Sequence, residues 1–371
     1  MIYLDYAASS PPFFQVIEEM GSVAQSHFGN PGALHTAGAS ARQILQKSRR
    51  ILAQSTNVRP EEIFFTSGGT ESNNWAVACG CVCGGKKHIV CSAAEHSSVL
   101  EAVRRMAQKG YDITYLNPAP DGRILPETVE NALRPDTSLL CVQAVNNETG
   151  VLQDVDALAE AAHKHGVRYF CDGAQSFGHV SQNLHKADLI SMSAHKLGGP
   201  RGVGCLIVRQ PNLIDPLILG GGQEFGYRSG TENLPGIAGF ALAAALSTEA
   251  LQQEQVRLCE LTSFFETELR LVVPQLVVAG AGAPRSSILC CAFPGISSEE
   301  MVMRLDLKGI CSSPGAACAA RNSQPSHVLL SMGYSPKEAS RFVRFSPGRN
   351  TTREEIIQTV TAIADILKKR N

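Results

Sequence analysis

The sequence predicts an α/β fold in which a mostly parallel, seven-stranded sheet is covered by helices and is followed by a smaller α+β domain. Two observations predict this fold. Short β-rich runs alternate with segments of helical periodicity between about residues 60 and 210, the order of elements expected for a parallel sheet. Beyond about residue 273 the elements become fewer and mixed. A chain of 371 residues is also long enough for a large and a small domain.

Seven short runs in the first part of the chain predict the strands. Most are rich in β-branched or aromatic residues, and turn residues follow most of them. In chain order they are EIFFTS, KHIVCS, DITYLN, SLLCVQAV, VRYFCD, DLISMSA and GCLIVR. Between them, SSVLEAVRRMAQKG and DVDALAEAAHKHG predict helices, because each has a basic last turn and then a glycine.

The second half of the chain predicts one long helix and then the smaller domain. The helical pattern runs from Leu234 to about Val273. The segments SSILCCAFPG and FVRFSPG predict strands, and SSEEMVMRLDLKG and TREEIIQTVTAIADILKK predict helices. We expect a large domain at residues 16–260 and a small domain formed by residues 1–15 and 261–371.

The balance of basic and acidic residues limits the classes of binding partner that we expect. The chain has 33 basic and 34 acidic residues and a formal net charge of -1, so it lacks the charge excess of a nucleic-acid or membrane-surface binder. The first residues do not have the pattern of a secretory signal, and the apolar run at 236–246 is too short to span a bilayer. We expect a cytoplasmic protein that binds small molecules or proteins, with no direct contact to nucleic acid or membrane.

The chain has twelve cysteines, and disulfides rarely form in the reducing cytoplasm. Most of them lie in apolar stretches, where a reduced thiol packs as a small hydrophobic group. The cluster CGCVCGG at 79–85 is the one that suggests a metal site. Cys79 and Cys83 would share one helix face and Cys81 would not, and no second ligand pair follows at zinc-finger spacing. We therefore expect no metal.

Polar residues follow several of the predicted strands, where open α/β sheets bind their ligands. SGGTESNN at 67–74 combines glycines with a helix start, which suits a phosphate, although an ordinary glycine-rich turn explains it as well. It is neither a Walker loop nor GxGxxG, so it points away from nucleotides. At later strand ends come His96, Asn147, Asp172 and Lys196.

Pyridoxal phosphate is the cofactor that requires this set of groups together. It needs a lysine for a Schiff base, and Lys196 is the candidate. It needs a carboxylate beside the pyridine nitrogen, which Asp172 would supply. Its phosphate would be held by Thr70, Ser193 and His195.

The order of these and other motifs resembles one enzyme family. The motifs are LDYAASS, FGNPGALH, TSGGTESNN, AAEHSSV, NNETGVLQD, DGAQSFG, SAHKLGGPRGVG, GGGQEFGYRSGTEN, SPGAAC and VRFSPGRNTTREEI. Together they resemble the cysteine desulfurases, the NifS/IscS-like group in the class V branch of fold-type I pyridoxal-phosphate enzymes. The resemblance runs from about residue 3 to 357. Phe225 departs from it, since many members have arginine there.

The resemblance implies roles for individual residues. Lys196, Cys318 and His96 correspond to catalytic positions, and His96 is also the residue that stacks on the cofactor ring. Thr231 matches a residue that reaches the phosphate of the neighbouring subunit, which implies a homodimer with shared active sites. The cofactor-binding positions are Gly69, Thr70, His96, Asn147, Asp172, Gln175, Ser193, His195, Lys196 and Thr231.

The resemblance also implies the reaction. Arg344 matches the arginine that binds the substrate carboxylate, and Asn147 lies near cofactor and substrate. L-cysteine would yield L-alanine and a persulfide on Cys318, which passes its sulfur to an acceptor protein for iron–sulfur cluster assembly, tRNA thiolation or other sulfur transfer. The alternatives are a selenocysteine lyase, another class V enzyme, or a protein of this fold kept as a binding partner without turnover.

Overall fold

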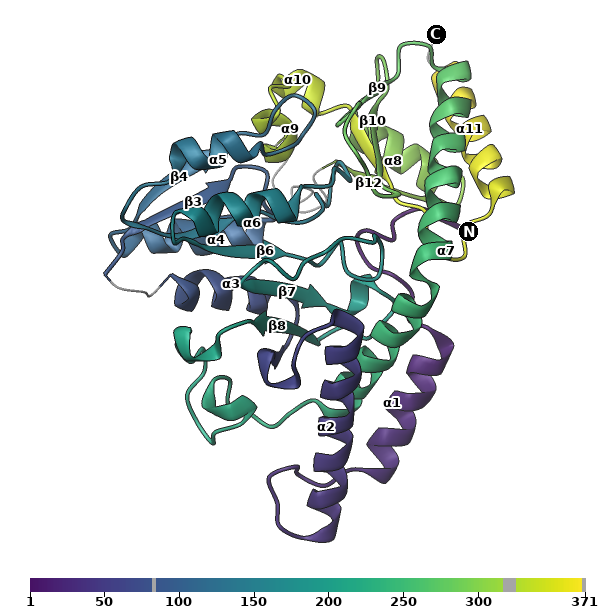
Figure 1. The fold of residues 1–371 in the computed structure, drawn as a ribbon. Coiled ribbons are helices and arrows are strands. Elements are labelled where there is room, and N and C mark those ends of the chain that lie inside the picture. The colour runs from purple at the N-terminus through teal and green to yellow at the C-terminus, as the bar shows by residue number, and fades with distance from the viewer. Residues whose placement is uncertain (82–84, 316–324, 369–371) are drawn as a thin grey trace.

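The structure, a computed structural model, describes residues 1–81, 85–315 and 325–368. Its largest sheet has seven strands in the order β2-β8-β7-β6-β5-β3-β4 (Figure 1). The strands are β2 (Ile63–Thr66), β3 (His88–Ser92), β4 (Asp112–Leu116), β5 (Thr137–Cys141), β6 (Arg168–Asp172), β7 (Leu189–Ser193) and β8 (Gly204–Val208). All seven predicted strands are confirmed. The sheet is mostly parallel, as predicted, since β8 alone runs antiparallel to its neighbours β7 and β2.

Helices cover both faces of this sheet. One face packs on α3 (Gly69–Gly80) and α4 (Ser97–Gln108), and the other on α2 (Thr36–Thr56), α6 (Val155–Lys164) and the first half of α7 (Leu234–Val272). Along β5, Leu139 and Cys141 belong to one core and Leu140 to the other. Burial on both faces explains why most of these strands read as largely apolar runs without alternation, whereas β4, at the edge of the sheet, is partly exposed.

The predicted helix ends are confirmed at α4 and α6. Gly110 follows α4 with φ +83°, and Gly166 follows α6 with φ +64°. Glycine adopts this left-handed conformation without a steric penalty from Cβ, so it ends the helix. The further helical segments are α1 (Phe14–Ser26), α5 (Pro126–Ala132) and the short 3-10 turns η1 (Pro60–Glu62), η2 (Ala194–Lys196), η3 (Pro211–Leu213) and η4 (Glu224–Gly226).

A second sheet lies at the end of the molecule that holds the C-terminal helix. Its strand order is β12-β13-β10-β9, and all of its pairs are antiparallel. The strands are β9 (Val277–Val278), β10 (Leu289–Ala292), β12 (Ser313–Pro314) and β13 (Phe342–Phe345). The helices beside them are α8 (Ser298–Asp306), α9 (His327–Ser331), α10 (Pro336–Ala339) and α11 (Arg353–Lys368). Near the N-terminus, β1 (Ile2–Tyr3) pairs with β11 (Ile310–Cys311), so the first residues join this part of the chain.

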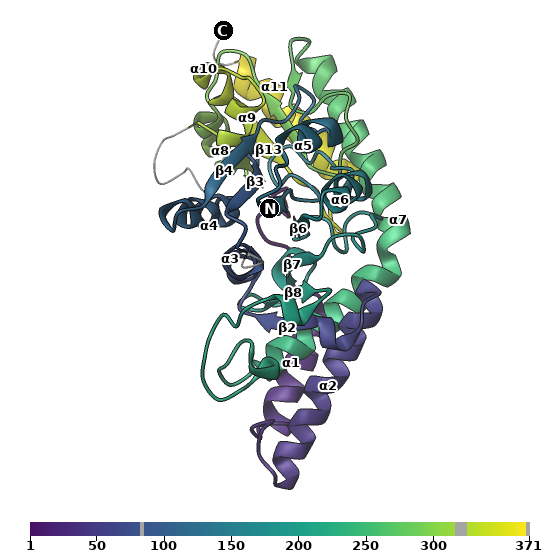
Figure 2. The same cartoon turned by 60° about the vertical axis from the view of Figure 1, so that its left-hand side comes forward.

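Helix α7 links the two parts, as Figures 1 and 2 show. Its first half packs on α1 and α2, and its second half places Phe265 and Leu269 in the core beside the second sheet. The division that we expect at residue 260 therefore falls inside an unbroken helix and stays a prediction. By length and composition α7 resembles a membrane span, but 56% of its most apolar window is buried inside the protein. Packing accounts for its apolar side chains.

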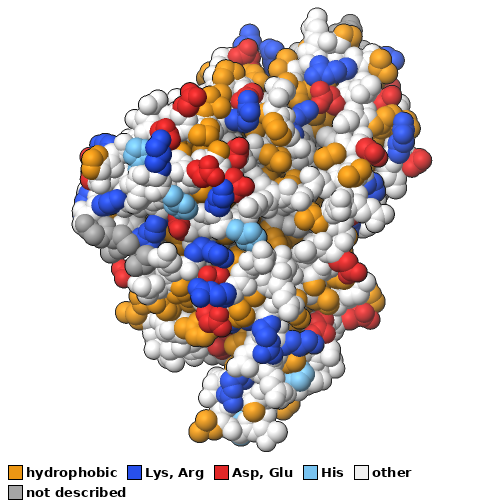
Figure 3. Space-filling view, in the orientation of Figure 1, with side chains coloured by type: hydrophobic (Ala, Val, Ile, Leu, Met, Phe, Trp, Pro, Cys, Tyr) orange, Lys and Arg blue, Asp and Glu red, His pale blue; other side chains and the backbone are white. Residues whose placement is uncertain are grey.

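The surface shows no separation of charge on the face that Figure 3 draws, where basic and acidic side chains are intermixed. This agrees with the formal net charge of -1.

The ion pair between Arg49 and Glu224 is buried. Arg49 of α2 binds Glu224 through two nitrogens, at 2.5 and 3.0 Å, and the Phe65 amide donates to the same carboxylate at 2.8 Å.

This buried pair fixes the loop between β8 and α7. Glu224 and Phe225 have φ of +48° and +57°, a conformation that is costly for residues other than glycine. The Arg49 guanidinium lies 5.0 Å from the centre of the Phe225 ring and 4.7 Å from that of Phe65. The ion pair and the two cation–π contacts offset the strain of the backbone.

We expect Glu224→Gln to lower the free energy of unfolding by about 3 kcal/mol, because Arg49 then stays buried without a counter-ion. Urea titration followed by the fluorescence of the single tryptophan, Trp75, measures the change. The control is Glu130→Gln, which removes an exposed pair with Lys164 and should change stability by less than about 0.5 kcal/mol. Equal losses in the two variants would contradict the importance of the buried pair.

Candidate active site

A cavity of about 300 Å³ lies at the carboxyl ends of β5, β6 and β7. This is where ligands bind in open α/β sheets. The structure brings most of the predicted site residues together around it: Gly69, Thr70, His96, Asn147, Asp172, Gln175, Ser193, His195, Lys196 and Arg344. The cavity is also lined by residues that the sequence analysis did not single out: Ala7, Ala8, Asn73, Ser98, Gln143, Val145 and Ala174.

Lys196 lies in the turn η2, directly after β7. Its Nζ donates hydrogen bonds to the backbone carbonyls of Ala7 at 2.6 Å and Ala8 at 3.0 Å. Its own carbonyl accepts from Ser10 Oγ at 2.6 Å and from His179 Nε2 at 3.0 Å. Both ends of the residue are therefore fixed, and the amine is directed into the cavity.

Asp172 is the last residue of β6 and is buried. Its carboxylate accepts from Asn73 Nδ2 at 2.7 Å and from the Ala174 amide at 3.0 Å. Asn73 comes from α3 and also donates to Ser98 Oγ at 2.8 Å. An acidic group held in this way remains available to a positively charged ring nitrogen in the cavity.

His96 precedes the first turn of α4 and caps it. Its Nδ1 accepts from the Ser98 amide at 3.2 Å and lies 2.7 Å from Ser98 Oγ. Burial lowers the pKa of His96 below its ordinary value, although the nearby Asp172 carboxylate opposes that shift. The proton of the neutral ring is therefore on Nε2, and the imidazole is locked in one orientation.

Four residues form a cradle suited to a phosphate group. Gly69 and Thr70 begin the twelve-residue helix α3, where backbone N–H groups lack intrahelical partners. Ser193 and His195 face them from the end of β7, and a Cβ on Gly69 would lie 3.6 Å from Ser193 Cβ. Burial, then the charges of Lys196 and Arg201, lower the pKa of His195 to about 4, so its ring is neutral at pH 7.

Arg344 lies on β13, is buried and lines the cavity. Its terminal nitrogens donate to the Asn147 carbonyl at 2.8 Å and to Asp5 Oδ1 at 2.9 Å. Arg344 Nε and Asn147 Oδ1 are buried and have no hydrogen-bond partner among the described residues. Buried polar atoms are normally paired, so this donor and this acceptor fit a ligand that carries both kinds of group.

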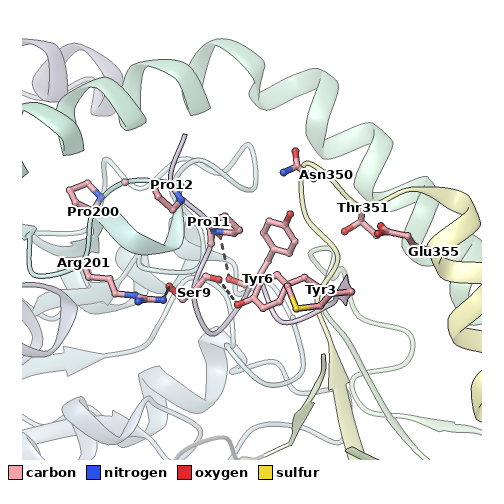
Figure 4. A pocket seen from close by; sticks show the side chains of 13 residues that line it. Tyr3, Tyr6, Ser9, Pro11, Pro12, Pro200, Arg201, Asn350, Thr351 and Glu355 are labelled. Carbon is pink, nitrogen blue, oxygen red and sulfur yellow. Dashed lines mark hydrogen bonds between the residues drawn. The ribbon is translucent and has the colours of Figure 1, made fainter. Parts of the chain in front are cut away.

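The N-terminal segment forms one wall of the cavity through Ala7 and Ala8, which no motif in the sequence indicates as site residues. Gln175 Nε2 donates to the Ala7 carbonyl at 2.8 Å, and the Ser10 amide donates to the His195 carbonyl at 2.9 Å. Figure 4 shows the other side of this segment, where Tyr3, Tyr6 and Ser9 line a second cavity of about 660 Å³. The contacts use backbone carbonyls, so no side-chain type in the sequence could have indicated them.

The remaining predicted residues either do not line this cavity or lie outside the described residues. Thr231 is exposed in the loop before α7 and does not line it. Cys318 and Cys83 lie outside the described residues. Cys81 is buried, and burial raises its pKa to about 11, so that its thiol is rarely deprotonated to the thiolate that would bind a metal. Within the described part of the chain, no group of three or more potential metal-binding side chains occurs.

The chain is similar over nearly its whole length to known proteins. The family model described as Aminotransferase class-V matches residues 2–358. The curated "Cysteine desulfurase IscS" of Dictyoglomus turgidum is 36% identical over 376 residues, covering 99% of this chain and 95% of that protein. A solved "NIFS-LIKE PROTEIN" superposes with a TM-score of 0.92 at 31% identity and covers 99% of both chains. A structure titled "SspA in complex with cysteine" has a TM-score of 0.83 at 32% identity, covering 95% of this chain and all (100%) of that one.

Glu148 is a buried carboxyl group next to this site. Its Oε2 accepts a hydrogen bond from Ser326 Oγ, at the start of α9. Burial raises the pKa of Glu148 from its ordinary value of 4.5 to about 7, against the opposing effects of that hydrogen bond and of the Arg344 charge. The folded protein therefore holds a proton on Glu148 at pH values where the unfolded chain has released it.

We expect Glu148 to make the protein less stable as the pH rises. The stability that its raised pKa contributes is complete below pH 4.5 and is lost on the way to pH 7, a difference of about 3 kcal/mol. Glu148→Gln imitates the protonated acid, so the variant should gain stability relative to the wild type between pH 5 and 8. Urea titrations of both proteins at several pH values measure the difference. A difference that does not change with pH would show that folding does not raise the pKa of Glu148.

Proposed function

The chain belongs to the aminotransferase class-V family and is a pyridoxal-phosphate-dependent cysteine desulfurase, and from this premise we propose that the cavity around Lys196 is its active site. The observation that carries the proposal is the convergence of a lysine amine, a buried carboxylate, a phosphate cradle and a buried arginine on one cavity of about 300 Å³. The overall reaction converts L-cysteine and an enzyme thiol into L-alanine and an enzyme persulfide.

The residues present fit the cofactor. Lys196 would hold it covalently, Asp172 would pair with its ring nitrogen, and Gln175 would contact its ring hydroxyl. His96 would cover one face of the ring, since its imidazole is fixed by the Ser98 hydrogen bonds. Gly69, Thr70, Ser193 and His195 would bind the phosphate. Pyridoxal phosphate, when bound, supplies an electron sink that stabilises negative charge on the carbon skeleton of the amino acid.

The substrate carboxylate would be bound by Arg344. A planar guanidinium suits a carboxylate, and Arg344 Nε is a buried donor without a partner among the described residues. Asn147 Oδ1, a buried acceptor that no described residue pairs with, would contact the substrate or cofactor. These two residues would fix the orientation of L-cysteine before any bond changes.

Lys196 and Cys318 would carry the proton and the sulfur. The Lys196 amine accepts the proton from the α carbon, and the carbonyls of Ala7 and Ala8 keep Nζ within the cavity. The Cys318 thiolate attacks the substrate sulfur, so that an S–S bond forms and the Cβ–S bond breaks. The bonding electrons stay with the carbon skeleton, which takes up protons and leaves as L-alanine. The assignment of Cys318 is supported by its place in the motif SPGAAC.

We propose further that the enzyme is a cytoplasmic homodimer with shared active sites. Thr231 is exposed and stands apart from the cavity of its own chain, as expected for a residue that would reach the phosphate of a neighbouring subunit. The Arg49–Glu224 pair would hold the loop that carries it. The persulfide sulfur would pass to an acceptor protein, for iron–sulfur cluster assembly, tRNA thiolation or another transfer.

Brief exposure of the purified holoenzyme to L-cysteine without reductant should add one sulfur atom to Cys318 and release one L-alanine. Mass spectrometry of the Cys318 peptide and quantification of alanine measure both products. Cys318→Ser should form no persulfide, whereas the matched control Cys311→Ser should behave like the wild type. Persulfide formation on another cysteine, with Cys318 unmodified, would overturn the assignment of the nucleophile.

Two inactive variants should restore activity to each other if the sites are shared. Lys196→Ala removes the amine, and Thr231→Asp places a negative charge where the neighbour's phosphate would lie. Random pairing in a co-expressed mixture should recover about a quarter of the wild-type activity, because each heterodimer contains one intact site. Alanine release, with native mass spectrometry to count heterodimers, measures this. Heterodimers without activity would contradict sharing.

A further inference from the structure

We propose that Asp5 is a positioning residue that orients the guanidinium of Arg344 toward the carboxylate of the substrate. The inference rests on the proposed role of Arg344. Asp5 does not line the cavity, whereas Arg344 does. Asp5 would therefore act on the substrate only through Arg344.

The contacts of Asp5 account for this role. Its Oδ1 accepts from a terminal nitrogen of Arg344 at 2.9 Å, and its Oδ2 accepts from Ser313 Oγ at 2.9 Å. Ser313 and Arg344 are direct partners across β12 and β13. One carboxylate therefore joins two neighbouring strands and uses both of its oxygens. An arginine held at one nitrogen by a fixed carboxylate has few other orientations open to it.

Asp5 is itself held in place by backbone contacts. It forms a bridge with Ser346 next to β13, and the Leu4 amide on its other side donates to the Cys311 carbonyl at 2.9 Å. Tyr3 Oη donates to the carbonyls of Asp5 at 3.1 Å and Ser9 at 2.8 Å, and so closes the turn after Asp5. Figure 4 shows Tyr3 beside Ser9 and Tyr6 in this turn. The carboxylate is therefore preorganised before a substrate arrives.

Burial makes a counter-ion for Arg344 necessary. Its side chain is only 3% exposed, and an isolated charge at such a depth is costly. Asp5 is the one ion-pair partner of Arg344 among the described residues. Glu148, a second carboxyl group close enough to interact with the charge of Arg344, has a pKa raised to about 7 by burial and carries only part of a charge near neutrality. Asp5 thus neutralises the guanidinium and leaves its Nε, which has no partner among the described residues, as a donor for the substrate.

A double-mutant cycle tests the inference. Asp5→Ala and Asp5→Asn are each made in the wild-type and in the Arg344→Ala background. Steady-state kinetics with L-cysteine give KM and kcat, and titration of the visible absorbance of the holoenzyme with L-alanine gives the affinity for the product without turnover. Ser313→Ala serves as the control that removes a contact of Asp5 but keeps its charge.

Asp5→Ala should raise KM and the dissociation constant of L-alanine about tenfold or more, with a much smaller change in kcat. Asp5→Asn should have a weaker effect, about threefold, because a neutral hydrogen bond replaces a charge-assisted one. Ser313→Ala should change these constants less than Asp5→Ala does. In the Arg344→Ala background the Asp5 substitutions should add nothing, since their effect passes through Arg344.

The outcomes separate this inference from the proposals on which it rests. If Arg344→Ala leaves KM unchanged, the assignment of Arg344 fails and the inference falls with it, while the desulfurase activity itself is unaffected. If Arg344→Ala raises KM but the Asp5 variants do not, or if they raise it equally in both backgrounds, the positioning role of Asp5 alone is overturned. Should Asp5→Ala not fold, Asp5→Asn decides by the same criteria, because it keeps the shape of the side chain.

Discussion

Hydrogen bonds between the N-terminal segment and the turn around Lys196 are the constraint on which the geometry of the site depends. The carbonyls of Ala7 and Ala8 accept hydrogen bonds from the Lys196 amine, and the Ala7 carbonyl also accepts one from Gln175. Ser10 donates hydrogen bonds to the carbonyls of His195 and Lys196. The same segment carries Asp5, which holds Arg344 of the second sheet. A stretch of six residues therefore sets the positions of the reactive amine and of the substrate-binding cation relative to each other. Rigid placement of such groups lowers the entropic cost of bringing substrate and catalytic groups together.

The sequence predicted the large sheet well because most of its strands are buried on both faces. A run such as SLLCVQAV is mostly apolar, and the glycines after α4 and α6 end those helices as their φ values require. Asp172, Ser193 and Lys196 could be chosen because they end such strands or directly follow one, and the carboxyl ends of parallel strands meet at one edge. The long helix was also predicted within one residue of its end, since the expected limit was about Val273 and α7 ends at Val272.

What the sequence did not predict depends on contacts between distant segments. Ala7 and Ala8 act through their carbonyl oxygens, which every residue has, so their type carries no signal. Asn73 lies inside a helix and meets Asp172, which is 99 residues away, only because α3 packs beside β6. Nothing in the local sequence marks Asp5 as a site residue, because its partner Arg344 lies 339 residues further along the chain. Pairings of this kind are properties of the tertiary fold.

Few of the side chains that line the cavity are charged, and burial determines which of them carry a charge. His96, His179 and His195 all lie near enough to Lys196 for its charge to lower their pKa values, and burial is the larger cause for each. The pKa values of His179 and His195 are about 4, so these rings are neutral near pH 7 and act as hydrogen-bonding groups.

Lys196 and Arg344 are then the cations that line the cavity, with Asp172 as its anion. Because Asp5 already neutralises Arg344 from outside the cavity, the guanidinium can offer directed donors to a carboxylate without the cost of an uncompensated buried charge. The site therefore selects its ligand by the direction of its hydrogen bonds more than by a general excess of positive charge.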